Sequence, residues 1–344
     1  MISIPTRAEP TTTSARRTAV LDTAVATACE LVDLRANEAT PATFADRLAA
    51  LAADHGVRVS VRDEGALRAE GFGAVLSVGA GSPNPPRLVT LSHEPRGAAG
   101  PPVAMVGKGV TFDSGGLSLK SPAAMVGMHR DKTGAAVVAA VVCAVADLGL
   151  QVPVRAYLPL AENLPGPDAT RPGDIVTSLS GTRIEVLDTD FEGRVLMADA
   201  LTLAVRDEPR ALLDVATLTY QVVTALGPGI AGVVGSDDAL VSAVLAAGRD
   251  AGEELWPLPL AARYRDQVRS ASERADLRNH PGSDVGRAIT AALFLAEFVG
   301  DVPWAHLDIS GPSERGSGVD AVPTGFGVRT LVRLVEALAE GGDR

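Results

Sequence analysis

Helical and extended patterns alternate along most of the chain. Apolar residues recur every three to four positions in the segments that we expect to be helices, which are 17–34, 43–55, 134–148, 194–206, 239–251, 286–299 and 325–339. Short apolar or alternating runs predict strands at 57–62, 74–78, 87–91, 102–106, 152–158, 183–187, 211–216, 230–235 and 304–309. Such alternation is typical of an α/β fold, in which a mostly parallel, twisted central sheet has helices on both faces.

The expected domain organisation is simple. Residues 1–18, which begin with a Pro- and Thr-rich stretch, are expected to form a flexible tail. Residues 19–344 are expected to fold as one domain, because no internal repeat or low-complexity linker divides them. Of the 344 residues, 46% are hydrophobic and only 3% are aromatic, so the core must consist of Ala, Val and Leu side chains. Such a core suits buried parallel strands between closely packed helices.

The charge and the apolar pattern argue against two classes of partner. The formal net charge is −11, and no cluster of Lys and Arg with interleaved aromatic residues occurs, so a nucleic-acid partner is not expected. No apolar run reaches the ~18 residues of a membrane span. The arginines near the N-terminus are not followed by an apolar segment and a cleavage site, so no signal peptide is expected. These patterns predict a cytoplasmic protein that contacts neither nucleic acid nor membrane.

Loops that follow the predicted strands carry the candidate chemistry. Sites in open α/β sheets form at the carboxyl ends of the strands, and the segments after 102–106, 183–187 and 211–216 are rich in Gly, Asp or Thr. The first of these segments contains four candidates, which are Lys108, Asp113, Lys120 and Asp131. Taken singly, each has an ordinary alternative role. The lysines suit a surface loop, the first aspartate suits an Asx turn, and the second suits a helix N-cap.

The second segment, after 183–187, favours a metal site over these ordinary roles. Asp188, Asp190, Glu192 and Arg194 alternate with other residues, so in an extended loop their side chains point the same way. The alternative is an acidic first turn of the helix expected at 194–206, which the helix dipole favours. Three carboxylates and an arginine within seven residues are more charge than a helix cap needs. Buried carboxylates require positive charge, and a divalent metal ion is its usual source.

Two of these segments resemble one known family. The sequence Gly-Lys-Gly-Val-Thr-Phe-Asp-Ser-Gly-Gly-Leu-Ser-Leu-Lys at 107–120 resembles the metal-binding segment of the leucyl aminopeptidase (cytosol aminopeptidase) family. The sequence Asp-Thr-Asp-Phe-Glu-Gly-Arg at 188–194 resembles the family signature Asn-Thr-Asp-Ala-Glu-Gly-Arg. Further matches lie at 162–165, 170–174, 216–219 and 324–329. The resemblance covers about residues 20–340, and its motifs are long and specific.

The resemblance implies a two-metal site in a phosphorylase/hydrolase-like zinc-peptidase fold, with residues 19–344 as the catalytic domain. Zn²⁺ or Mn²⁺ would be bound by five residues, which are Lys108 as a neutral amine, Asp113, Asp131, Asp190 and Glu192, with the glutamate bridging both ions. Lys120 would polarise the scissile carbonyl, and Arg194 would hold a bicarbonate ion that acts as general base. The residues expected to line the substrate pocket are Met128, Phe191, Thr217, Leu218, Thr219 and Tyr220.

Four positions depart from the family pattern. Lys132 stands where the family has Met. It would weaken metal binding if its side chain pointed into the site, and it could equally point to solvent. Asp188 replaces Asn and adds negative charge near the metals. Phe191 replaces a small residue between two ligands and is expected to narrow the pocket. Tyr220 replaces Gly and is expected either to exclude some substrates or to offer a hydroxyl group to a polar one.

The leading hypothesis is a dinuclear metal-dependent aminopeptidase that acts on short peptides or aminoacyl amides, with altered specificity. One alternative is a dedicated hydrolase or acyl-transfer enzyme for a specialised metabolite, and another is a weakly active or non-enzymatic scaffold derived from the family. Family members carry a separate N-terminal domain, which is expected to be largely missing here. Their catalytic domains form the centre of a hexamer, so the resemblance also implies a homo-oligomer.

Overall fold

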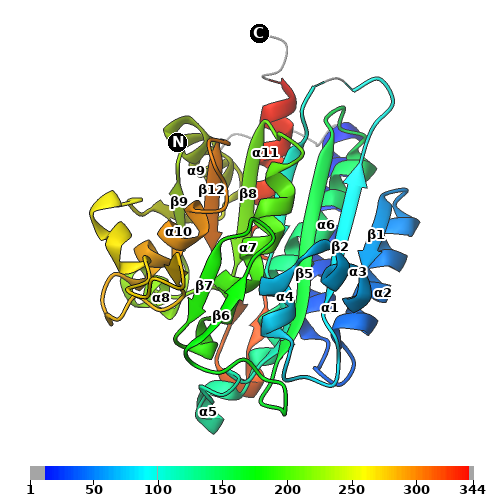
Figure 1. The fold of residues 1–344 in the computed structure, drawn as a ribbon. Coiled ribbons are helices and arrows are strands. Elements are labelled where there is room, and N and C mark those ends of the chain that lie inside the picture. Colours follow the sequence, from blue (N-terminus) through cyan, green and yellow to red (C-terminus); the bar gives the residue numbers. More distant parts are fainter. Residues whose placement is uncertain (1–11, 99, 341–344) are drawn as a thin grey trace.

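The computed structural model describes residues 12–98 and 100–340, and a nine-stranded sheet forms the centre of this part of the chain (Figure 1). The strand order is β1-β2-β5-β3-β8-β12-β9-β10, with β4 paired to β5 beyond the end of β3. The strand bounds are β1 Arg58–Arg62, β2 Arg87–His93, β3 Val103–Gly107, β4 Gly109–Asp113, β5 Val154–Asn163, β8 Ala211–Ala216, β9 Ala231–Gly235, β10 Leu255–Pro257 and β12 Trp304–Asp308.

The middle of the sheet is parallel and its flanks are mixed. Strands β4, β5, β3, β8 and β12 all run in the same direction. On one side β2 runs antiparallel to β5, and β1 runs antiparallel to β2. On the other side β9 runs antiparallel to β12, and β10 is parallel to β9. The sequence-based prediction of a mostly parallel sheet is therefore confirmed for the part that bears the site.

Helices cover both faces of the sheet. One face packs against α1 Thr12–Asp33, α2 Pro41–Asp54, α6 Thr133–Leu148, α9 Asp238–Ala251 and α11 Val328–Glu340. The other face packs against α3 Glu64–Glu70, α4 Gly73–Val78, α7 Glu192–Val205 and α10 Arg287–Ala296. Successive residues of a strand point to opposite faces, so Val103 and Met105 join the first core and Ala104 and Val106 join the second. Both faces of β3 are buried, which explains its uniformly apolar sequence.

Short elements complete the described part of the chain. A three-stranded sheet contains β6 Asp174–Thr177, β7 Arg183–Val186 and β11 Leu277–Arg278, and a small hairpin pairs β13 Glu314–Arg315 with β14 Val322–Pro323. The remaining α-helices are α5 Pro122–Met125 and α8 Tyr220–Leu226. Single 3-10 turns lie at Met128–Arg130, Thr189–Phe191, Ala262–Gln267 and Gly318–Asp320. Among the described residues, no helix combines the length and the apolar character that a bilayer crossing requires.

The sequence-based prediction of elements differs from the structure in several places. The segment expected as a strand at 74–78 is helix α4, because its buried residues Ala74, Val75 and Val78 have helical spacing that a five-residue apolar run does not reveal. The elements that were not predicted from the sequence are strand β4, helix α8 and the short elements α3, α5, β6, β10, β11, β13 and β14. The expected tail falls largely on residues 1–11, outside the described part, and α1 already begins at Thr12.

Candidate metal centre

The candidate residues lie at the carboxyl ends of the parallel strands, as the sequence predicts. Lys108 separates β3 from β4, and Asp113 is the last residue of β4. Because β3, β4 and β8 run in the same direction, their ends meet at one edge of the sheet. The first residue of α7, Glu192, reaches the same place. Chain segments far apart in the sequence thus deliver their polar side chains to one site.

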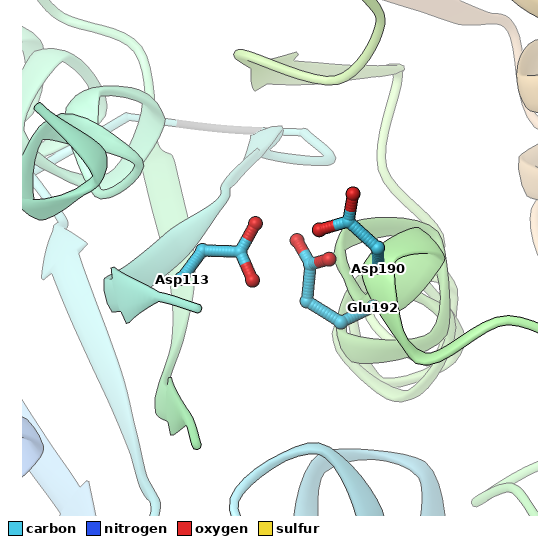
Figure 2. A group of neighbouring side chains, drawn as sticks. All are labelled: Asp113, Asp190 and Glu192. Carbon is cyan, nitrogen blue, oxygen red and sulfur yellow. The ribbon is translucent and has the colours of Figure 1, made fainter. Parts of the chain in front are cut away.

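Three carboxylates converge at the centre of this site (Figure 2). Oxygen atoms of Asp113, Asp190 and Glu192 lie within 4.8 Å of one another. Asp113 points from strand β4 toward the other two, which project from the turn that leads into α7. Asp113 and Glu192 are buried, and Asp190 is partly buried. Carboxylates this close repel one another unless positive charge lies between or beside them.

Lys108 supplies part of that charge. Its Nζ lies 2.6 Å from Oδ2 of Asp131 and 2.9 Å from Oε1 of Glu192, and its side chain is only 4% exposed. Gly193 makes this approach feasible, because a Cβ at that position would lie 2.5 Å from Cε of the lysine. Any larger residue after Glu192 would therefore displace the lysine. The close packing of the 188–194 motif against Lys108 therefore requires a glycine at position 193.

Lys120 contacts the other two carboxylates of the site. Its Nζ is 2.8 Å from Oδ2 of Asp113, and it also forms an ion pair with Oδ1 of Asp190. The lysine follows a loop that is closed by a hydrogen bond from its own backbone N–H to the carbonyl oxygen of Ser114. The two lysines thus contact different pairs of carboxylates, Lys108 those of Asp131 and Glu192 and Lys120 those of Asp113 and Asp190.

The protonation behaviour of the site reflects burial first and charge second. Burial raises the pKa of Asp190 to about 7, with Asp113 adding to the shift and Lys120 opposing it. Burial also raises the pKa values of Glu192 and Asp131 above their ordinary range. For Lys108, burial lowers the pKa, but Asp131 and Glu192 outweigh it and the net shift is upward. The neutral amine implied by the resemblance therefore needs the positive charge of bound metal ions.

The residues present fit divalent cations. Four carboxylates, those of Asp113, Asp131, Asp190 and Glu192, and the ammonium groups of two lysines leave a charge of −2 when all are ionised. Oε2 of Glu192 is buried and has no hydrogen-bond partner within the described residues. A buried carboxylate oxygen without a donor is costly, whereas it is a suitable ligand for a hard cation.

Two amide side chains that the sequence did not single out, and one threonine predicted only for the substrate pocket, hold these groups in place. Asn163, at the end of β5, donates from Nδ2 to Oδ1 of Asp113 at 2.8 Å and to the carbonyl oxygen of Thr189 at 3.0 Å. Asn279 is fully buried, and its Nδ2 donates to the carbonyl oxygen of Asp188 at 2.6 Å. Both amides fix the loop at 188–191, and only the three-dimensional structure reveals that they reach it. Thr217 donates to Oδ1 of Asp131 at 2.7 Å, so it also orients a carboxylate.

Two adjoining pockets open onto the cluster. The larger, of about 510 Å³, is lined by the carboxylates and lysines and by Met128, Thr217, Leu218, Thr219 and Tyr220. The smaller, of about 190 Å³, is lined by Lys120, Asp190, Phe191, Glu192, Gly193, Arg194, Leu218, Thr219, Tyr220, Gln221 and Arg287, and we call it the arginine pocket. All the residues predicted for the site therefore line one or both pockets. The lining residues that were not predicted include Arg287 and Gln221 in the arginine pocket and Arg130, Ser310 and Glu314 in the larger one.

Lys132 is directed neither into the site nor to solvent, so both orientations considered from the sequence are wrong. Its side chain is fully buried. Its Nζ donates to the carbonyl oxygens of Val32 and Leu34, each at 2.8 Å, and of His129 at 2.6 Å. The reason is that the end of α1 passes behind the turn that precedes α6 and presents unpaired carbonyl groups to it. The lysine binds this helix end, not the metal ligands.

The other three departures have separate positions. Asp188 accepts the backbone N–H of Asp190 at 2.9 Å, so it caps the turn that carries this candidate ligand. Phe191 lines the arginine pocket, and it does not line the larger one. Tyr220 begins α8, is 76% exposed and borders both pockets. The two aromatic substitutions therefore act at different places, one inside the arginine pocket and one at the rim.

The fold and the cluster of carboxylates and lysines together define the catalytic domain of a metallo-aminopeptidase. The model of the cytosol aminopeptidase family, catalytic domain, matches residues 26–332, and the chain belongs to this family. This membership confirms the resemblance drawn from the segments at 107–120 and 188–194.

Similar proteins agree with the family assignment. A probable cytosol aminopeptidase of Rhodococcus jostii is 44% identical over 347 residues, which cover 99% of this chain and 68% of that protein. Another, of Leifsonia xyli subsp. xyli, is 48% identical over 321 residues, which cover 89% of this chain and 64% of that protein. The chain thus spans about two thirds of the length of these relatives. The solved structure of the bottromycin maturation enzyme BotP in complex with Mn has a TM-score of 0.91 and 43% identity, covering 96% of this chain and 73% of that one.

Proposed function

We propose that this protein is a dinuclear metal-dependent aminopeptidase that removes the first residue of short peptides or aminoacyl amides. The observation that carries the proposal is the buried carboxylate cluster between Lys108 and Lys120, in which Oε2 of Glu192 has no donor among the described residues. Membership of the cytosol aminopeptidase family supports the same activity.

Five residues would hold the metal ions. Asp113, Asp190 and Glu192 offer oxygen ligands from one side, and Lys108 and Asp131 complete the set. The family binds two divalent ions, and Mn is present in the related BotP structure. When bound, such ions polarise a carbonyl group and lower the pKa of a water molecule. They can also bind a free α-amino group, which suits cleavage at an N-terminus.

The chain's own cations act on the charge that develops in the reaction. Burial opposes protonation of Lys120, but Asp113, Glu192 and Asp190 raise its pKa above the ordinary value, so it stays charged. A charged ammonium at the edge of both pockets is placed to donate to the carbonyl oxygen of the scissile bond as that oxygen gains negative charge. Arg194, whose Nε and Nη1 have no partner within the described residues, would bind a bicarbonate ion that accepts a proton from the attacking water.

A second candidate function is a dedicated reaction on one specialised metabolite. The likeness to BotP favours it, because that protein is a maturation enzyme for bottromycin and is 43% identical to this chain. Phe191 and Tyr220 alter the two pockets relative to the family pattern, which would suit a restricted substrate. Both candidate functions use the same metal-binding residues and differ in the substrate.

A peptidase assay with matched variants tests the proposal. The protein loaded with Mn²⁺ or Zn²⁺ is incubated with a broad dipeptide panel, and release of the first residue is measured. Glu192→Ala should lose both metal binding, measured by calorimetric titration, and activity, whereas Glu273→Ala, at an exposed position, should retain both. Metal binding without cleavage of any dipeptide would favour the dedicated reaction. No metal binding at saturating concentration would favour a non-enzymatic scaffold.

The assembly and the location of the protein stay predictions. The hexamer implied by the family resemblance predicts a particle of about six chains, which light scattering after size-exclusion chromatography measures. The cytoplasmic location follows only from the sequence pattern and the resemblance.

A further inference from the structure

Three basic side chains line the arginine pocket. They are Arg194, Arg287 and Lys120, and the lysine also forms ion pairs with Asp113 and Asp190 of the carboxylate cluster. Cζ of Arg194 is 4.7 Å and Cζ of Arg287 is 5.2 Å from the centre of the Phe191 ring. The phenylalanine therefore fixes two guanidinium groups beside one cavity of about 190 Å³.

The guanidinium group of Arg194 is poorly satisfied by the protein. The residue is 3% exposed, and its Nε and Nη1 are buried without a hydrogen-bond partner in the described part of the chain. Unpaired buried donors of this kind call for an oxyanion that accepts from them.

Arg287 is held in a less buried setting at the start of α10. Its side chain is 20% exposed and forms an ion pair with Asp284, whose side chain is 92% exposed. Its Nε donates to the carbonyl oxygen of Ser283 at 3.1 Å, and its Nη2 lies 3.3 Å from Nε2 of His280. A partner as exposed as Asp284 is weakly bound, so a ligand carboxylate can replace it.

The two pockets differ in charge, and this difference orients a peptide. The larger pocket is lined by five carboxylates and three cations, which are Asp113, Asp131, Asp190, Glu192, Glu314, Lys108, Lys120 and Arg130. The arginine pocket has only two carboxylates, Asp190 and Glu192, beside the cations Lys120, Arg194 and Arg287. An α-amino group belongs with the carboxylates and their metal ions. The second residue of the substrate, which follows the scissile bond, therefore extends toward the arginines.

We propose that Arg287, in the arginine pocket, binds a carboxylate on the second residue of the substrate beside the bicarbonate held by Arg194, so that this chain prefers peptides with Asp or Glu at that position. The inference rests on the proposed aminopeptidase function and extends it to the substrate class. Bicarbonate has the same oxyanion chemistry, so the experiment must separate the two ligands. The pocket would then select substrates by the charge of the second residue. Asn has nearly the shape of Asp but no charge, so a comparison of the two isolates this effect.

The experiment compares two C-terminally amidated dipeptides that differ only in Asp or Asn as second residue, with the first residue selected by the dipeptide panel. Wild type should show a kcat/KM ratio of at least about ten in favour of Asp, the effect of one charge-assisted hydrogen bond. Arg287→Gln should bring the ratio close to one. Arg274→Gln removes an exposed arginine that lines neither pocket and should leave the ratio unaltered.

Two further measurements distinguish a substrate carboxylate from bicarbonate as the ligand, and the carboxylate pocket from the aminopeptidase activity. Both peptides are assayed in carbonate-free buffer and with added bicarbonate. If bicarbonate raises turnover of both peptides equally and Asp has no advantage, the inference is overturned. In parallel, aspartic acid amide and asparagine amide are titrated into the protein, and Arg287→Gln should weaken only the former, by about tenfold. If neither peptide is cleaved, the aminopeptidase proposal fails, and the titration alone supports or overturns the carboxylate pocket.

Discussion

The ammonium nitrogen of Lys132 lies 2.8 Å from the carbonyl oxygen of Val32, one hundred residues earlier in the chain. With its contacts to Leu34 and His129, this buried lysine connects the end of α1 to the turn that carries Asp131. A cation beside a candidate metal ligand is thus part of the scaffold behind the site.

Replacing this lysine is expected to destabilise the protein strongly. Lys132→Met restores the residue of the family pattern, but it leaves two buried carbonyl groups and one partly buried carbonyl group without their donor. The expected loss in the free energy of unfolding is about 2–4 kcal/mol, measured by chemical denaturation. Arg274→Met removes an exposed cation instead and should change the stability by less than about 0.5 kcal/mol. If Lys132→Met lowers the free energy of unfolding by less than about 1 kcal/mol, the lysine does not have this bridging role.

Lys120 is expected to affect the reaction and not the binding of metal. Lys120→Met removes the only cation that contacts both Asp113 and Asp190 in the described structure and that borders both pockets. Loss of a donor to the developing negative charge should lower kcat by about 10²–10³-fold. Calorimetric titration should still find two metal ions, because the five candidate ligands remain. Partial recovery in Lys120→Arg would support an electrostatic role, whereas loss of metal in Lys120→Met would assign the lysine to the structure of the site.

Tyr220 is expected to restrict the first residue of the substrate. It borders the larger pocket and is 76% exposed, so its removal costs little packing. Tyr220→Gly should raise kcat/KM for bulky first residues relative to small ones by about three- to tenfold. Tyr220→Phe separates the two explanations, because it keeps the ring and removes the hydroxyl group. If the phenylalanine variant shows the same change as the glycine variant, the hydroxyl group and not the ring sets the preference.

The parts of the fold that follow from local pattern were predictable from the sequence. Val103 to Val106 are apolar on both faces, so a central strand was expected there and occurs. The approach of Lys108 to Glu192 was implied by the two motifs and by their resemblance to the family. In contrast, the run at 74–78 is too short for its periodicity to distinguish a strand from a helix.

Contacts between distant segments were not predictable. Nothing in the residues around Lys132 indicates that the end of α1 supplies its partners. Likewise, Arg287 lies nearly one hundred residues after Phe191, and only the packing of α10 beside α7 brings the two side chains together. The effects of Lys132 and Phe191, two departures from the family pattern, therefore depend on contacts that only the tertiary structure shows.

Asp199 provides a test of stability away from the metal site. This carboxylate lies in the core on α7 and accepts the backbone N–H groups of Val75 at 2.9 Å and Leu179 at 2.7 Å. Burial raises its pKa to about 6, although both hydrogen bonds act in the opposite direction. The folded protein therefore holds the proton more tightly than the unfolded chain, in which an aspartate has a pKa of about 3.9.

This shift fixes the sign of the pH dependence. Because the folded pKa is the higher one, the contribution of Asp199 to stability is fully present below about pH 4 and is lost as the pH rises through about 6. The free energy of unfolding of the wild type, minus that of Asp199→Asn, should therefore fall by about 2–3 kcal/mol between about pH 4 and pH 7. Taking the difference cancels the titration of the other carboxylates. Denaturation curves at a series of pH values measure it, and Asp266→Asn, at an exposed position, should give a flat difference. A flat profile for Asp199→Asn as well would mean that the carboxylate titrates alike in the folded and unfolded chains.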